Sequence, residues 1–281
     1  GIDAKTIPLD NKEVMSLFLN TSALKITPED IDGCPLGALG IPEFGTDFVI
    51  QMLVDTKPKS FSDLVRISGL SHGTDVWLGN AQTLIQEGKA TISTAICTRD
   101  VPDWYIWSCK KIKYMFPKAH AAAYVMMAFR IAWFKIFYPL AYYAAYFSIR
   151  ASSFSYELMC QGQAKLLYHM EEYKKRYDKL SKKEQDTYKD MKIVREMYAR
   201  GFTFLPIDLY KAQARRFQIL DGKLMPALST IEGLGDKAAD AVVDAAKEGT
   251  FLSKDDFRER TKVSKTVIDL MTELGILNGL P

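Results

Sequence analysis

The sequence predicts a mainly α-helical protein with a small α+β segment and two helical hairpins in series near its end. Residues 117–147 are the most apolar stretch and have the composition of a helix buried on most sides. The run from Gln163 to Arg200 mixes acids and bases three or four positions apart, which is typical of helices. From Gly201 apolar and polar residues alternate around turn residues, which indicates short strands.

The overall composition is that of an ordinary globular protein. The 281 residues are 48% hydrophobic and 25% charged, and a net charge of +3 neither requires nor excludes a polyanionic partner. The cysteines lie far apart without a C-x-x-C pair, which argues against zinc and disulfides and fits a reducing cytoplasm. They are Cys34, Cys97, Cys109 and Cys160. The first ten residues lack the basic start and apolar run of a signal peptide.

Residues 1–150 form one compositional block, in which short helices surround an ordered loop. The loop, residues 27–45, is dense in Gly and Pro. Helices are expected in residues 10–24, entered from Asp10 or Asn11; in 47–58; in 60–70, capped by Ser60 or Ser62; and in 75–90, ended by Gly88.

The apolar stretch 117–147 is too interrupted for a membrane span. A span needs about 18 or more consecutive apolar residues, and Arg130, Lys135 and Pro139 divide this one. It is therefore expected to be a core helix, with Pro117 at its first position.

The second half of the chain contains two further segments with different sequence patterns. Residues 163–200 are expected to form a solvated helical pair that bridges two domains. Residues 201–228 are expected to form strands or a hairpin, with Asp221-Gly222 as the turn.

Lys118 and His120 form the first candidate site. Both fall in the first turn of the apolar helix, where N–H groups lack partners and cations are locally unfavourable. A bound anion reverses the sign of that effect, and Phe116 offers a stacking face beside it. The alternative is a solvated lysine beside a histidine satisfied in the core, and these residues by themselves leave both interpretations open.

Two weaker candidates accompany this pair. Gly69 and Gly73 bracket a loop of small and polar residues: Ser71, His72, Gly73, Thr74 and Asp75. Thr74 or Asp75 is expected to cap the following helix, so the loop suits a phosphate or sugar, although an ordinary capped turn has the same residues. Arg99 is followed by an aspartate, and such an Arg-Asp step is usually a surface ion pair or a cap, so Arg99 matters only if the fold brings it near Lys118.

Residues 228–251 carry a helix-hairpin-helix signature. Gly233 and Gly235 allow a tight turn and leave backbone N–H groups open at the next helix start, and Lys237 adds positive charge. Such a turn grips one backbone phosphate without reading bases. A second, degenerate unit follows with Ser264 and Lys265 at its bend, and two units give a four-helix module that straddles duplex DNA. The alternative is a hairpin that packs only on protein.

Asp30 and Asp32 resemble paired metal carboxylates. They lie in the Gly/Pro-rich loop without a third acid at a readable spacing, so a turn or cap is expected instead.

These motifs together resemble a known family. "FPKAHAAAYVMMAFRIAWFKIFYPLAYYAAYF" closely resembles the Lys-x-His-x-Ala-Ala-Tyr helix of C-family bacterial replicative DNA polymerases, the polymerase III alpha subunits. "DIDGCPLGALGIPEFGTDFV", "SGLSHGTDVWLGNAQTLI" and "CKKIKYMFPKAHAAAY" look specifically like the PolC type. The resemblance covers nearly the whole chain and is patchiest in residues 151–200.

The resemblance implies three parts: polymerase fingers in residues 1–150, a helical linker with a strand-containing segment in 151–225, and a tandem helix-hairpin-helix module for duplex DNA in 226–281. In that family the fingers hold the incoming dNTP. Carried over to this sequence, Arg99, Lys118 and His120 match basic residues that face the triphosphate. The loop 71–75 and Phe116 match the wall beside the nucleotide.

The resemblance also implies parts that this chain lacks. The palm aspartates, which bind Mg²⁺ and catalyse attack by the primer, are expected before Gly1, so the fragment by itself is expected to be inactive. A sliding-clamp peptide is expected after Pro281. "CTRD" runs directly into "VPDWYIW", where the family has a longer connecting segment with additional basic residues. The alternative function is a non-catalytic helix-hairpin-helix DNA-binding module.

Overall fold

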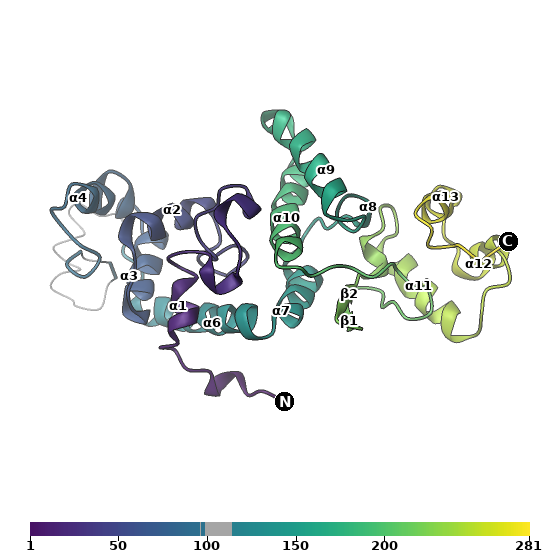
Figure 1. Cartoon of the computed structure of the whole chain (residues 1–281), viewed down its shortest axis with the longest axis horizontal. Coiled ribbons are helices and arrows are strands. Elements are labelled where there is room, and N and C mark those ends of the chain that lie inside the picture. The colour runs from purple at the N-terminus through teal and green to yellow at the C-terminus, as the bar shows by residue number, and fades with distance from the viewer. Residues whose placement is uncertain (96, 99–113) are drawn as a thin grey trace. The chain divides into compact units, whose positions relative to one another are not determined.

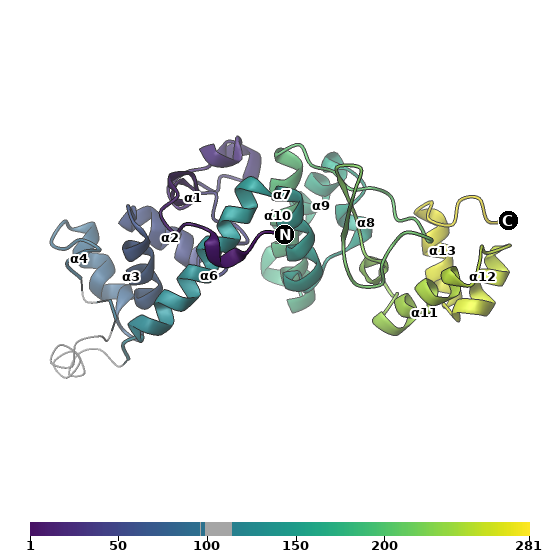
Figure 2. The same cartoon turned by 90° about the horizontal axis from the view of Figure 1, so that it is seen from below.

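The computed structural model of the chain describes residues 1–95, 97–98 and 114–281. The chain divides into two compact units, Gly1–Tyr138 and Pro139–Pro281. Figure 1 and Figure 2 show helices throughout and a single two-stranded sheet in the described part of the chain. The predicted mainly α-helical class with a small strand-containing segment is therefore confirmed.

The first unit is helical. Its helices are α1 (Lys12–Ser16), α2 (Asp47–Thr56), α3 (Phe61–His72), α4 (Gln82–Gln86) and α6 (Lys118–Phe137), and its shorter helical turns are Ala4–Thr6, Ser22–Leu24, Pro28–Ile31 and Trp77–Ala81. The predicted caps Asn11 and Ser60 are confirmed, because their side chains accept from the N–H groups of Val14 and Asp63. The single helix predicted for residues 75–90 is wrong, since Gly79 has a φ of 66° and breaks it.

The core of the first unit forms where α6 packs against α3 and α1. Phe129 on α6 is fully buried, and its ring lies 6.5 Å from that of Phe18 and 6.1 Å from that of Phe61. One face of α6 is therefore in the core, but the expected burial on most sides is wrong, because Tyr124, Met127 and Phe137 are exposed. The apolar stretch is also not one helix, since α6 ends at Phe137 and a separate helix begins at Pro139. None of the helices in the described residues is long and apolar enough to cross a membrane.

Lys135 explains how a charge is tolerated inside this apolar helix. Its side chain is fully buried, and Nζ donates to the carbonyl oxygens of Gly37 (2.8 Å) and Leu39 (2.6 Å). A buried cation is costly unless its donors are satisfied. Lys135 therefore fastens the Gly/Pro-rich loop to α6, and the prediction that this loop is ordered is confirmed.

The second unit contains the remaining helices and both strands. They are α7 (Pro139–Ala145), α8 (Tyr156–Met159), α9 (Gln163–Lys175), α10 (Lys182–Ala199), β1 (Gln218–Leu220), β2 (Lys223–Met225), α11 (Asp236–Lys247), α12 (Lys254–Thr261) and α13 (Lys265–Glu273), with helical turns at Tyr146–Arg150, Tyr177–Lys179 and Leu228–Thr230.

The predicted helical pair is α9 and α10, which pack on each other. Solvation of both helices was expected, and for α10 this is wrong. Met191, Val194 and Met197 recur three positions apart within the charged run and are fully buried. Burial also raises the pKa of Asp190, on the same helix, to about 6, although its carboxylate accepts from the Ser153 N–H.

The strand pair confirms the predicted turn. β1 and β2 are antiparallel, with Leu220 opposite Lys223, and Asp221 and Gly222 at the tip have φ values of 51° and 70°. Positive φ at both central residues is the geometry for which Asp-Gly is favoured in two-residue hairpins.

The last residues form the helical hairpin module, whose buried core continues into earlier residues such as Tyr156 and Ile207. Leu228, Leu234, Val242, Phe257 and Met271 are nearly or fully buried within it. Four α-helices were expected, and this is wrong: three α-helices are present among the described residues 226–281. The first arm of the first hairpin is only the short turn Leu228–Thr230.

Candidate functional site

The start of α6 presents its two basic residues to solvent. Pro117 was predicted to be the first residue of the helix, but it is the N-cap, with φ −66° and ψ 129°. The helix α6 therefore begins one residue later, at Lys118. Lys118 and His120 are both exposed. Pro117 makes no side-chain cap bond to this helix start, where the first-turn N–H groups lack intrahelical partners and the macrodipole is positive beside the two basic side chains. Both predicted residues therefore lie at an anion-compatible helix end.

A row of four aromatic rings connects α3 to α6. His72 stacks on Phe116 with ring centroids 4.7 Å apart, and the edge of Phe116 meets His120 at 5.1 Å. His120 in turn stacks on Tyr124 at 4.4 Å. Three of these residues were predicted as site residues, Phe116 and His120 from one motif and His72 from another, and the structure brings them together. Tyr124 was missed, although it lies four residues after His120 on the same helical face.

Glu43 anchors the far end of this row. Its Oε2 lies 3.2 Å from Nε2 of His72, while Nδ1 of His72 lies 2.8 Å from the carbonyl oxygen of Ser68 and 3.0 Å from the hydroxyl of Ser71. Glu43 itself has a φ of 70°, which is unusual for a residue other than glycine. It was also missed, because nothing in the sequence pairs a loop glutamate with a histidine 29 positions later.

The segment 71–75 is not the helix start that was predicted. Ser71 and His72 form the last turn of α3, and the next helical turn begins only at Trp77. A helix C-terminus presents carbonyl groups, so it does not receive a phosphate. Thr74 instead donates its N–H to the carbonyl of Tyr114 (2.9 Å), which joins the approach to α6 to the end of α3.

Gly73 and Gly69 allow two close approaches to α3. A Cβ on Gly73 would lie 2.9 Å from the Tyr114 carbonyl oxygen, and a Cβ on Gly69 would lie 2.5 Å from that of Cys97. The chain just before residue 99 therefore passes against α3. Arg99 and the junction between Asp100 and Val101 lie outside the described residues.

The second candidate is the hairpin module, whose first turn is built from glycine. Gly233 has a φ of 79° and lies against α13, where a Cβ would be 3.0 Å from Val267. Gly235 is the N-cap of α11, and no described side chain caps the N–H groups that follow it. Lys237 lies exposed in the first turn of α11.

The second turn is built differently. Lys262 has a φ of 58°, and the hydroxyl of Ser264 accepts from the Val267 N–H at 3.4 Å. Lys265 is the first residue of α13. All three polar side chains are exposed. This turn therefore offers the charge of two lysines, while one of the N–H groups at the start of α13 is already bonded to Ser264.

An open cleft of about 1000 Å³ in the second unit is lined in part by the first turn itself, residues 231–236. Its charged lining has the acids Glu157, Glu184, Glu232 and Asp236 and the bases Lys183 and Arg215. Glu157 accepts from the Glu232 N–H at 3.0 Å, and Lys183 pairs with the Glu232 carboxylate at 2.8 Å. The excess of acids does not suit a phosphate backbone.

The described residues do not form a metal site. No group of three or more His, Cys, Asp or Glu side chains among them is arranged to hold an ion. Asp30 accepts from the N–H of Thr27 at 2.8 Å, so its predicted role as a cap is confirmed.

Comparisons with known proteins agree with the predicted resemblance. Residues 1–100 match the family model of the bacterial DNA polymerase III alpha subunit finger domain, and residues 201–281 match that of a helix-hairpin-helix motif. Over its whole length the chain is 47% identical to DNA polymerase III PolC-type of Clostridium perfringens, 44% to that of Caldanaerobacter subterraneus and 46% to that of Bacillus subtilis. The resemblance to PolC-type polymerases is thus confirmed.

The chain spans 22% to 23% of the length of these relatives. The alignments run over 321 or 322 positions against the 281 residues of the chain, so each relative has at least 40 residues without a counterpart here.

Proposed function

We propose that this chain, which carries the fingers domain and helix-hairpin-helix motif of PolC-type DNA polymerase III, supplies the dNTP-binding and duplex-binding surfaces of a replicative DNA-directed DNA polymerase. The observation that carries the proposal is the outward-facing start of α6, where Lys118 and His120 lie exposed beside the aromatic row. Residues 1–150 act as fingers, 151–225 as a linking segment and 226–281 as the duplex-binding module.

In the nucleotide site, Lys118 contacts the triphosphate as a point charge, and the first-turn N–H groups of α6 add their partial charge. His120 and Arg99 complete the basic set. Phe116 and His72 form the wall beside the nucleotide, held by Glu43. Ser71, Gly73, Thr74 and Asp75 belong to the same wall through the end of α3, and Gly73 permits the close backbone approach.

The chemistry of the whole polymerase needs Mg²⁺, which would neutralise charge on the phosphates. The described residues contain no group of three or more His, Cys, Asp or Glu side chains that could hold an ion, and we propose that the palm of the longer protein holds Mg²⁺. This chain contributes positioning and charge on the nucleotide side of the reaction. The sliding clamp is a further proposed partner, through a segment beyond residue 281.

In the duplex site, Gly233 and Gly235 bring backbone N–H groups to one phosphate, with Lys237 beside them. At the second turn, Lys265 meets a second phosphate, and Ser264 positions it as the N-cap of α13. Contacts of this kind make binding independent of sequence and sensitive to salt.

A nucleotide titration tests the proposal. A dNTP is added to the 281-residue chain and to a Lys118→Ala variant, and heat of binding is measured. Loss of a charge-assisted contact, worth roughly 1.5–3 kcal/mol, is expected to weaken binding about tenfold or more. Lys12→Ala is the matched control, because Lys12 is also an exposed first residue of a helix, where Asn11 already caps the N–H groups.

Equal affinity of the wild type, Lys118→Ala and Lys12→Ala would contradict the nucleotide site. Duplex binding without any nucleotide binding in the wild type would instead support the alternative, a non-catalytic DNA-binding module.

A further inference from the structure

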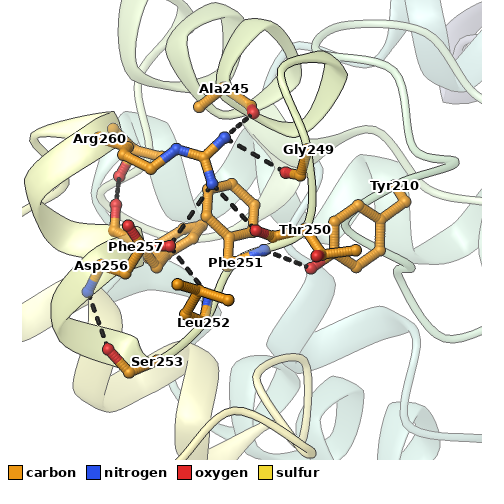
Figure 3. Close-up of polar contacts among 11 residues, drawn as sticks. Tyr210, Ala245, Gly249, Thr250, Phe251, Leu252, Ser253, Asp256, Phe257 and Arg260 are labelled. Carbon is orange, nitrogen blue, oxygen red and sulfur yellow. Dashed lines mark hydrogen bonds and ion pairs between the residues drawn. The ribbon is translucent and has the colours of Figure 1, made fainter.

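Arg260 lies in a module that is proposed to bind DNA, and its charge suggests a phosphate contact. The structure gives its donors another use (Figure 3). Nη2 donates to the carbonyl oxygens of Ala245 and Gly249, and Nη1 donates to the carbonyl of Thr250 at 3.2 Å. The remaining Nη1 hydrogen faces Asp256 Oδ2 at 3.4 Å. Four of the five guanidinium donors are thus engaged within the protein.

The position of the guanidinium agrees with these bonds. It lies over the ring of Phe251, 4.5 Å from the centroid, and only 23% of the Arg260 side chain is exposed. A guanidinium that is stacked and bonded in this way has a fixed orientation. Arg260 therefore fastens α12 to the end of α11 and to the linker between the two hairpins.

The linker is held from its other side as well. The Phe251 N–H donates to the hydroxyl of Tyr210 at 3.0 Å, and their rings lie 5.9 Å apart. The Leu252 N–H donates to Asp256, the same carboxylate that faces Arg260 (Figure 3). The carbonyl groups of Gly249 and Thr250 and the N–H groups of Phe251 and Leu252 are thus all bonded within the protein. The link between the hairpins is therefore held in place before any ligand arrives.

We propose that Arg260 is a positioning residue that sets the spacing of the two hairpin turns and thereby makes the module selective for duplex over single-stranded DNA. This inference rests on the proposed duplex binding. Two rigidly linked grips bind cooperatively only when their spacing matches that of two phosphates. Phosphates of a duplex have fixed positions, whereas a flexible single strand adapts to grips at any spacing. Loosening the clamp therefore costs duplex affinity more than single-strand affinity.

Fluorescence anisotropy with labelled duplex and single-stranded DNA of one sequence, over a range of salt concentrations, tests this inference on the 281-residue chain. Arg260→Lys keeps the charge but cannot form the four-way fork. It is expected to lose about tenfold in duplex affinity and less than about twofold in single-strand affinity. Its slope of log affinity against log salt stays unchanged, because no phosphate contact is removed.

Arg258→Gln is the matched control, since Arg258 is an exposed arginine on the same helix and its loss removes one charge without touching the clamp. Its duplex to single-strand ratio should stay at the wild-type value. Tyr210→Phe removes the hydroxyl that receives the Phe251 N–H and should lower the ratio two- to threefold. It decides the matter if Arg260→Lys melts before the assay temperature.

An unchanged duplex to single-strand ratio in folded Arg260→Lys and in Tyr210→Phe would overturn the inference. So would a salt slope reduced by about 0.9 in Arg260→Gln, because that is the loss of one phosphate contact. Absence of duplex binding in the wild-type chain would refute the proposed function itself, a result distinct from either of these.

Discussion

The two hairpin turns of the module hold similar places in their hairpins but are built from different chemistry. At the first turn, Gly235 is the N-cap of α11 and no side chain among the described residues caps the helix, so the helix-start N–H groups stay available. At the second turn, Ser264 is the N-cap of α13 and uses its hydroxyl to satisfy the Val267 N–H. A glycine turn offers backbone donors, whereas a serine turn consumes one.

The second turn has more basic neighbours than the first, although it offers fewer free backbone donors. The first turn has Glu232 and Asp236 as neighbours, and Lys237 is the basic residue that we assign to it. The second turn has Lys262 and Lys265. Under the proposed duplex binding, the first turn is expected to bind phosphate mainly by hydrogen bonds and the second mainly by charge. The second hairpin lacks the glycines of the first but has basic residues at its turn.

The largest expected effect comes from Gly233→Val. A β-branched residue at a φ of 79° costs roughly 1–2 kcal/mol in backbone strain. The added Cβ would also lie 3.0 Å from Cγ2 of Val267, so that side chain must shift to make room. We expect a clear fall in the unfolding free energy by urea titration and loss of duplex binding by anisotropy.

The control for this variant is Gly222→Val. Gly222 has a φ of 70° at the strand turn, and no heavy atom of the described residues lies within 4 Å of its Cβ position. It should bear the backbone strain alone and keep its duplex affinity. Wild-type stability in Gly233→Val would show that the first turn has a conformation other than the one described.

The second effect in size comes from Gly235→Ser, which converts the first turn to the chemistry of the second. The φ of −69° suits serine, and the described residues leave its Cβ position open. The new hydroxyl caps α11, so stability should stay equal or rise by a few tenths of a kcal/mol. Duplex affinity should fall about tenfold, since hydrogen bonds to a charged group are worth roughly 1.5–3 kcal/mol. Unchanged affinity would place the phosphate elsewhere than the first turn.

A smaller effect is expected from Lys265→Gln. Removal of one phosphate contact lowers the salt slope of binding by about 0.9 and duplex affinity a few-fold at moderate salt. Lys247→Gln is the control, because Lys247 lies at the far end of α11 and pairs with Asp244 at 3.0 Å. A steeper loss in Lys247→Gln than in Lys265→Gln would reverse the assignment of charge to the second turn.

The smallest effect is expected from Ser264→Gly, the reciprocal exchange. Glycine is nearly as good an N-cap as serine, so stability should fall by only a few tenths of a kcal/mol. Binding should stay within about twofold, because the lysines rather than the cap carry the contact. A tenfold loss of duplex affinity in a folded Ser264→Gly variant would mean that the hydroxyl itself meets a phosphate.

Several local features of the fold were predictable because single residues decide them. Asp221-Gly222 specifies a two-residue turn, and Asn11 and Ser60 specify helix starts. Errors arose where a local preference competed with packing. Thr74 and Asp75 are good caps, yet α3 continues to His72 and Thr74 bonds to Tyr114 instead. The short Leu228–Thr230 turn stands where an α-helix was predicted, and the residues of this segment by themselves do not indicate the difference.

The sequence by itself determined the helical class, the apolar helix with its two basic residues at the start, and the glycine-based turn, because each depends on the spacing of a few residues along the chain. Tertiary structure alone decided that Glu43 anchors His72, that Lys135 is buried on loop carbonyls, and that Arg260 clamps a linker rather than facing outward. These outcomes depend on groups far apart in the sequence. A charged side chain ends where buried acceptors compensate for its lost hydration, and only the folded chain places those acceptors.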